Sequence, residues 1–108
     1  MRYTVAVRGA GWVELPAYGL ADAEHQVEKE IRAIWPDASV NVTDVARMDE
    51  RSRIVEEFRV AYRVRGTVPM EAEGEGEARR AALRQLRGRF AGSRFERIMW
   101  EPAPPLGS

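Results

Sequence analysis

Few side chains in this sequence are suited to catalysis or metal binding. The chain of 108 residues has no cysteine and one histidine, His25. This composition excludes disulfides, thiolate nucleophiles and cysteine-rich metal sites. His25 lies two residues from both Ala23 and Val27, which places it about 200° around a helix from these apolar side chains. We therefore expect His25 to be exposed, without the oriented partner that a general base needs.

The serines offer no better nucleophile. Ser39, Ser52 and Ser93 have no base at a spacing that would activate a hydroxyl. We predict that the protein is not an enzyme, and that it has no catalytic residues, no bound cofactor and no metal ion.

The composition is that of one globular domain without net charge. Hydrophobic residues make up 44% of the chain, enough for a core, and the length suits a single domain. The 17 basic residues balance 17 acidic ones, so the whole molecule has no general attraction to nucleic acid or to an anionic membrane. No apolar run approaches the roughly 20 residues of a membrane span, and the N-terminus lacks the apolar block of a signal peptide. We expect a cytoplasmic protein with no membrane partner.

An internal repeat organises the chain. When the sequence is shifted by 55 residues, the segment 3–35 aligns with 58–90 without a gap. The matched pairs include Gly11 with Gly66 and Gly19 with Gly74. Apolar periodicity alone would not pair the glycines. We therefore predict two copies of a strand–helix–strand unit, over residues 2–48 and 53–101.

Each copy is predicted to begin with a strand and to continue with a helix. The strands have alternating apolar side chains: Tyr3, Val5 and Val7 in the first copy, and Phe58, Val60, Tyr62 and Val64 in the second. At Gly11 and Gly66 we expect a bend, followed by a short second extended piece. Two true hairpins there would instead produce a sheet of six strands. The helices have apolar stripes: Leu20, Ala23, Val27, Ile31 and Ile34 in the first, and Ala78, Ala82, Leu86 and Phe90 in the second.

A final strand is expected to end each copy, over residues 40–45 and 95–101. The polar residues 48–52 are predicted to form a hairpin loop, and the proline-rich residues 102–108 a flexible tail outside a single domain of residues 1–101. The resulting order is strand, helix, strand, strand, helix, strand. It predicts an α+β fold of the ferredoxin-like kind, a two-layer sandwich with an antiparallel sheet and both helices on one face.

The open side of this sheet is predicted to be rich in arginine. If the apolar side chains of the first and third strands face the helices, five arginines face away: Arg2, Arg8, Arg59, Arg63 and Arg65. The second strand would add Asn41, Thr43, Val45 and Arg47 to this side. The aromatic residues of the third strand would be buried with the valines. The side is therefore a candidate for contact with phosphate groups rather than for base recognition.

The last strand indicates a partner. In an extended segment Phe95 and Met99 would point one way and Trp100 the other, so that both sides would carry large apolar groups. With helices on one side only, a second copy of the chain is the simplest cover for the other side, and the C-terminal tail folding back is the alternative. We predict a homodimer whose interface involves Phe95, Met99 and Trp100.

Taken together, these features favour a non-enzymatic interaction module that self-associates through its sheet. The alternative is a nucleic-acid-binding protein that uses the arginine-rich side of the sheet, and this alternative is less favoured. A third class is a small-molecule binder with a dimer cleft lined by Trp12, Trp35 or Trp100.

Overall fold

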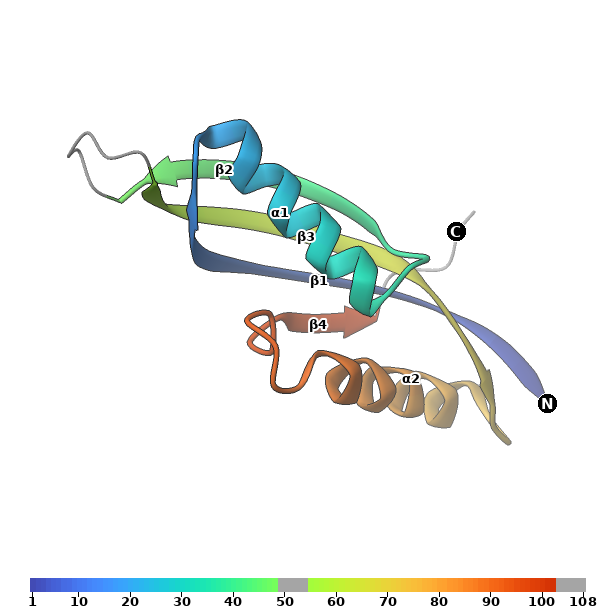
Figure 1. The fold of residues 1–108 in the computed structure, drawn as a ribbon. Coiled ribbons are helices and arrows are strands. Elements are labelled where there is room, and N and C mark those ends of the chain that lie inside the picture. The colour runs from blue at the N-terminus through green and yellow to red at the C-terminus, as the bar shows by residue number, and fades with distance from the viewer. Residues whose placement is uncertain (49–54, 103–108) are drawn as a thin grey trace.

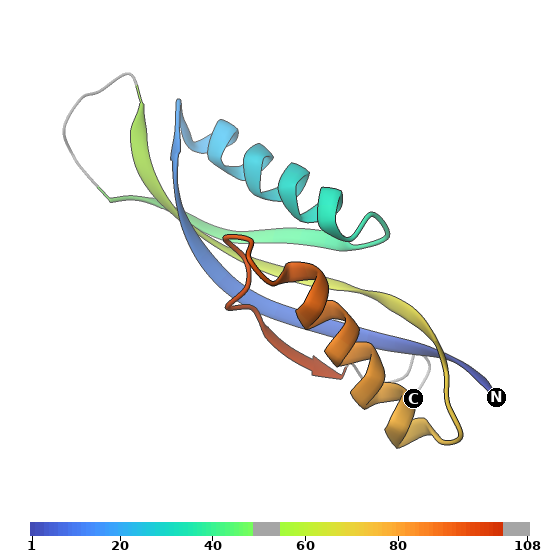
Figure 2. The same cartoon turned by 60° about the horizontal axis from the view of Figure 1, so that its bottom comes forward.

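The computed structural model describes residues 1–48 and 55–102. In this part of the chain the elements are β1 (Arg2–Ala17), α1 (Leu20–Ile34), β2 (Ser39–Arg47), β3 (Glu56–Glu71), α2 (Glu75–Phe90) and β4 (Met99–Pro102). They form one sheet in the order β2–β3–β1–β4, in which all neighbouring strands are antiparallel. Both helices lie on the same side of the sheet (Figure 1, Figure 2). The predicted α+β class and the ferredoxin-like order of elements are confirmed.

Two predicted segments fall mainly outside the described residues. These are the hairpin loop at 48–52, of which only Met48 is described, and the tail at 102–108, of which only Pro102 is described. Pro102 belongs to β4, where it is paired with Val7. The sheet therefore continues one residue past the predicted end of the domain.

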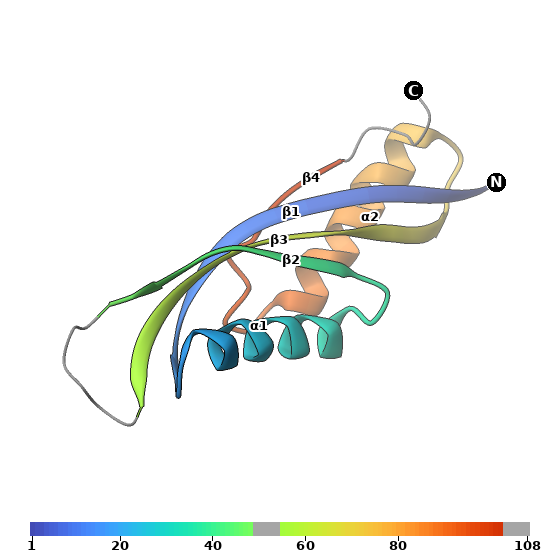
Figure 3. The ribbon, with the colours of Figure 1, turned by 90° about the horizontal axis from the view of Figure 1, so that it is seen from above.

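The predicted bends at Gly11 and Gly66 do not divide the strands. β1 and β3 are each 16 residues long and pair along their whole length without a register shift. Figure 3 shows that both strands curve strongly but continuously. Since the alternation of side chains runs through each glycine, the two extended pieces expected in each copy are one strand. A Cβ atom added to Gly11 would lie 2.8 Å from the hydroxyl oxygen of Tyr62, so glycine is needed here for space.

Two further glycines make room for tryptophan rings on the side of the sheet that faces the helices. A Cβ atom added to Gly66 would lie 2.6 Å from Cζ2 of Trp35, which follows α1. One added to Gly9 would lie 2.8 Å from Cε3 of Trp100. In both places a ring packs directly on the strand backbone, which only a residue without a side chain allows.

The strand pairing follows the internal repeat. Gly11 is opposite Tyr62, and Gly66 is opposite Val7. The shift of 55 residues converts the first pair into the second. The same shift relates the starts of the two helices. The backbone N–H of Tyr18 donates to Asp22 at 3.0 Å, and the backbone N–H of Glu73 donates to Glu77 at 3.3 Å. The two copies are therefore equivalent in their strand, in their helix and in the hydrogen bond that precedes the helix.

The predicted core is confirmed. Val27 and Ile31 of α1 and Leu86 and Phe90 of α2 are all fully buried. The residues of β1 and β3 that were expected to pack against them are also buried: Val5, Val7, Val60 and Tyr62. α1 covers β2 and one end of the central strands, whereas α2 covers the other end beside β4 (Figure 2).

β2 departs from the expected alternation. Its register with β3 shifts between Val42 and Asp44, which leaves Thr43 as an extra residue. Val45 is therefore opposite the buried Val60 and packs partly against the core. The prediction that Val45 and Arg47 lie on the side away from the helices is wrong, because a single bulge reverses the faces of all following residues and Arg47 is opposite the buried Phe58.

The last strand is shorter than predicted. Eight residues, 91–98, separate α2 from β4, against four between α1 and β2. Within the longer connection the backbone turns, with hydrogen bonds from Glu96 N to Ser93 O and from Ile98 N to Phe95 O. Phe95 consequently belongs to a turn and not to the strand, and the expected strand over 95–101 is wrong in its first half.

The packing of Trp35 on Gly66 yields a stability prediction. We expect Gly66→Ala to lower the free energy of unfolding by about 1–3 kcal/mol, because the new methyl group must displace the tryptophan ring. Urea denaturation of the purified chain measures the change. In a Trp35→Phe background the smaller ring leaves room, so the same substitution should be less destabilising there. Equal losses in both backgrounds would contradict the packing argument.

Candidate functional site

The side of the sheet that points away from the helices, here called the open face, holds the arginines predicted from the sequence. Side chains of even-numbered residues in β1 and odd-numbered residues in β3 lie on this face. The five arginines on it are exposed: Arg2, Arg8, Arg59, Arg63 and Arg65. Between them lie the small side chains of Ala6, Ala10 and Ala61. The result is a flat surface that presents guanidinium groups.

Two arginines lie opposite each other at the centre of the open face. Arg8 and Arg65 are direct cross-strand partners, an arrangement in which like charges repel. Nε of Arg8 lies 2.7 Å from a carboxylate oxygen of Glu101, its neighbour on β4. Among the residues that the structure describes, no carboxylate lies within ion-pair distance of Arg65 or of Arg63. Arg2 also has no ion pair among the described residues, so three of the five arginines on this face are not neutralised there.

Trp12 is the residue of this face that sequence reasoning missed. Its side chain is 57% exposed. The guanidinium carbon of Arg59 lies 4.6 Å from the centroid of the Trp12 ring, a cation–π arrangement. Arg59 also forms an ion pair of 2.9 Å with Glu14. The prediction ended the first strand at Gly11, but the alternation of buried and exposed positions continues through it, and that signal would have placed Trp12 beside the arginines.

The three predicted interface residues are not on one surface. Phe95 is buried and makes an edge-to-face contact of 5.5 Å between ring centroids with Tyr62. Trp100 points toward the helices, with ring centroids 5.9 Å from Trp35 and 5.2 Å from Phe90. Met99 is the exposed one.

The prediction that Phe95 shares a face with Met99 is therefore wrong, and Met99 is the large apolar side chain that β4 presents on the open face. The turn before β4 brings Phe95 to the same side as Trp100, so both serve the core. Met99 lies on the open face opposite Ala10 and is 78% exposed. Of the three tryptophans considered for a ligand cleft, Trp12 alone is exposed.

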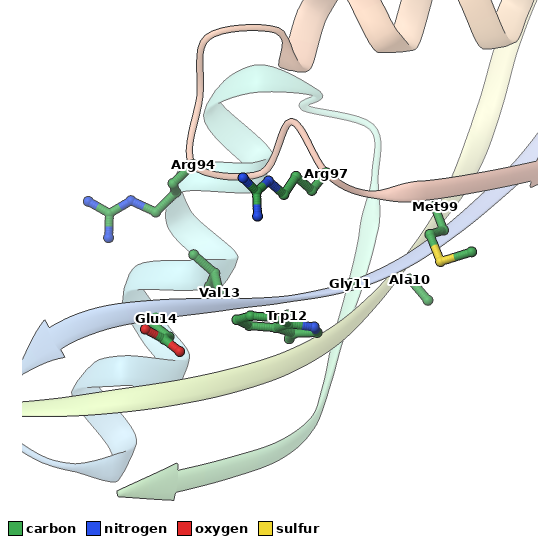
Figure 4. Close-up of a pocket in the computed structure, with 8 residues that line it drawn as sticks. All are labelled: Ala10, Gly11, Trp12, Val13, Glu14, Arg94, Arg97 and Met99. Carbon is green, nitrogen blue, oxygen red and sulfur yellow. The ribbon is translucent and has the colours of Figure 1, made fainter. Parts of the chain in front are cut away.

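A pocket of about 430 Å³ lies at the edge of β1, just before the point where β4 begins to pair with it. Arg94 and Arg97 lie on one side of the β1 ribbon, and Trp12 and Glu14 on the other (Figure 4). Nε of Arg94 lies 3.4 Å from Oε1 of Glu30, and Glu14 forms an ion pair with Arg59. The lining thus offers guanidinium groups and one indole ring but no carboxylate free to act as a base.

The described residues offer little else for chemistry. None of the buried residues among them is polar or charged, and they contain no cluster of three or more metal-ligating side chains. His25 is exposed, as predicted. The hydroxyl of Tyr62 lies in the core, where desolvation by burial raises its pKa from 10.0 to about 12. Tyr62 therefore remains neutral across the physiological range.

No protein-family model, curated protein or solved structure matches this chain. Among the helices of the described residues, none has the length and the apolar character needed to cross a membrane. The function must therefore be argued from the surface of the molecule.

The raised pKa of Tyr62 predicts a loss of stability in alkaline solution. Between pH 10 and about 12 the unfolded chain loses the phenolic proton while the folded chain retains it, so folding becomes less favourable as the pH rises. Below pH 10 this contribution is fully present. When the free energy of unfolding is measured by urea denaturation at a series of pH values, it should decline more steeply with rising pH for the natural chain than for Tyr62→Phe. Parallel curves for the two chains would contradict the assignment.

Proposed function

We propose that this protein is a non-enzymatic interaction module that docks a protein partner on its open face, and that the partner is a second copy of the chain. The observation that carries the proposal is the location of the exposed apolar side chains. The described residues include seven large ones: Met1, Trp12, Tyr18, Leu20, Met48, Val55 and Met99. Trp12 and Met99 lie on the open face and line the same pocket, whereas Leu20 belongs to α1 and the other four lie just beyond the ends of strands.

The open face has the residue types that protein interfaces favour. Tryptophan, methionine and arginine are enriched at interfaces, and Trp12, Met99 and Arg63 represent them here. Tyr18 and Val55 extend the apolar surface where β1 ends and β3 begins. Exposed apolar groups gathered on one face indicate an interaction site more strongly than the same groups scattered over the surface.

The charges of the open face favour a copy of itself over a polyanion. Its five arginines are matched in number by five carboxylates: Glu14, Asp44, Glu57, Glu71 and Glu101. A face with zero net charge and both signs present can be complementary to itself across a two-fold axis. A carboxylate from the partner beside Arg65 would also relieve the repulsion between Arg65 and Arg8.

The alternative, nucleic-acid binding on the same face, has one supporting observation, the exposed ring of Trp12. Bases can stack on such a ring. Two of the five arginines, Arg8 and Arg59, are already paired with carboxylates, however. The neutral charge of the face supplies little of the electrostatic attraction on which such binding depends.

Light scattering during size-exclusion chromatography tests the proposal. At tens of micromolar the natural chain should elute with the mass of two chains. The interface of such a dimer is expected to bury on the order of 1,200 Å² or more. Trp12→Glu and Met99→Glu should each shift the protein toward a monomer, because each places a charge in the apolar part of the interface.

Leu20→Glu is the matched control, since it makes the same change at an exposed apolar residue of a helix, and it should leave the dimer intact. A natural chain that is monomeric at this concentration, or a dimer that Leu20→Glu disrupts as strongly as Trp12→Glu, would overturn the assignment of the open face. Salt-sensitive binding of an oligonucleotide that Trp12→Ala abolishes would favour the alternative.

A further inference from the structure

The outer side of α2 has a row of arginines. Arg80, Arg84 and Arg87 are spaced by four and three residues, which places them along one line of the helix. All three are exposed. They lie opposite the buried stripe of the helix, formed by Ala78, Ala82, Leu86 and Phe90. α2 covers the sheet from the side opposite the open face (Figure 2), and the exposed row lies on the side of α2 away from its buried stripe.

The helix that carries this row is strongly basic, although the chain has no net charge. From residue 77 to 90 there are five arginines and one acid. Among the described residues one of the five, Arg79, has an ion-pair partner, Glu75 at 2.9 Å. Arg87 and Arg89 in the last turn interact favourably with the helix dipole, which explains arginine at these two positions. Arg80 and Arg84 lie too far from the end of the helix for the dipole to explain them.

A glycine in this row has no structural reason within the chain. Gly88 lies in the last turns of α2, with Arg84, Arg87 and Arg89 as its neighbours on the helix. A Cβ atom added to it would meet no other atom within 4 Å. Glycine is among the least favourable residues in a helix. Since no neighbouring atom requires a residue without a side chain here, the packing of the chain does not explain Gly88. Its missing side chain leaves bare backbone between guanidinium groups, where a ligand can approach closely.

We infer that the outer side of α2 binds the phosphate backbone of a nucleic acid. The row from Arg80 to Arg87 spans about 10 Å along the helix axis. Each strand of double-stranded DNA presents one negative charge per about 3.4 Å of the duplex axis, so the row is long enough to contact about three phosphates of a strand. Bare backbone at Gly88 lets the helix lie close to the phosphates. The inference does not depend on the proposed dimer, because the row and the open face lie on opposite sides of the sheet.

Fluorescence anisotropy with a labelled duplex of mixed sequence tests this inference. The full chain should bind at about 50 mM salt and lose affinity steeply toward about 200 mM. The triple variant Arg80→Gln, Arg84→Gln, Arg87→Gln should bind at least about tenfold more weakly. Its slope of log K against log salt should be shallower by about 2–3, since three phosphate contacts are lost. Glutamine is a good helix former, and circular dichroism verifies that the variant is folded.

The matched control removes three exposed positive charges that lie outside both α2 and the open face: Lys29→Gln, Arg32→Gln, Arg97→Gln. It changes the net charge of the chain equally, so it should bind almost as tightly as the natural chain. Equal losses in the two triple variants would overturn the inference, because binding would then follow net charge alone. Failure of the natural chain to bind at about 50 mM salt would also overturn it, as would binding to anionic phospholipid vesicles without binding to the duplex.

Gly88→Ala separates a binding role from helix stability. Alanine should raise the melting temperature of the chain, because it favours the helix. It should also weaken duplex binding several-fold, because the methyl group holds the backbone away from the phosphates. A Gly88→Ala chain that binds as tightly as the natural one would contradict close approach at this position.

Discussion

The packing of Trp100 on Gly9 is the contact on which the centre of the molecule depends. Gly9 lies in the middle of the β1–β3 pairing, opposite Val64, at the point where the two copies of the repeat are related to each other. The ring of Trp100 occupies the space above it and contacts Trp35 and Phe90, which close the ends of α1 and α2. The two helices are thus joined through this aromatic group, since each covers a different end of the sheet. Large rings over a bare strand give a core with few voids.

The duplication also separates the two surfaces that we propose to be functional. Both helices lie on one side of the sheet, so the other side is left without cover. That open face holds Trp12 and Met99 among balanced charges, which suits a protein partner. The outer side of α2 holds Arg80, Arg84 and Arg87 almost without acids, which suits a polyanion. A dimer formed through the open faces would place one basic helix on each outer side, where both remain accessible.

Much of the fold could be predicted because it depends on local patterns. The alternation of Val5 and Val7, the helical spacing of Val27 and Ile31, and the repeat of both in the second copy lead directly to two strand–helix units. The errors arose where a pattern was interrupted. Gly11 looked like a break in a strand, and so Trp12 was separated from Arg8. Phe95 looked like part of a strand, because Gly92 and Ser93 indicate a turn directly after the helix but do not show that the turns continue as far as Ile98. The bulge at Thr43 has no sequence signal of its own.

The sequence by itself determined the order of the elements, the α+β class, the buried faces and the exposed arginines, because hydrophobic periodicity acts within a few residues of the chain. It also determined the charge asymmetry of the second helix. Only the tertiary structure decided that Gly9 and Gly66 lie beneath tryptophan rings, that Phe95 and Trp100 share one core, and that Trp12 lies against Arg59. The contacts of Gly9, Gly66 and Trp12 join residues far apart in the sequence and depend on the register of the strands and on the packing of the helices on the sheet. The placement of Phe95 depends on the turns in the connection before β4.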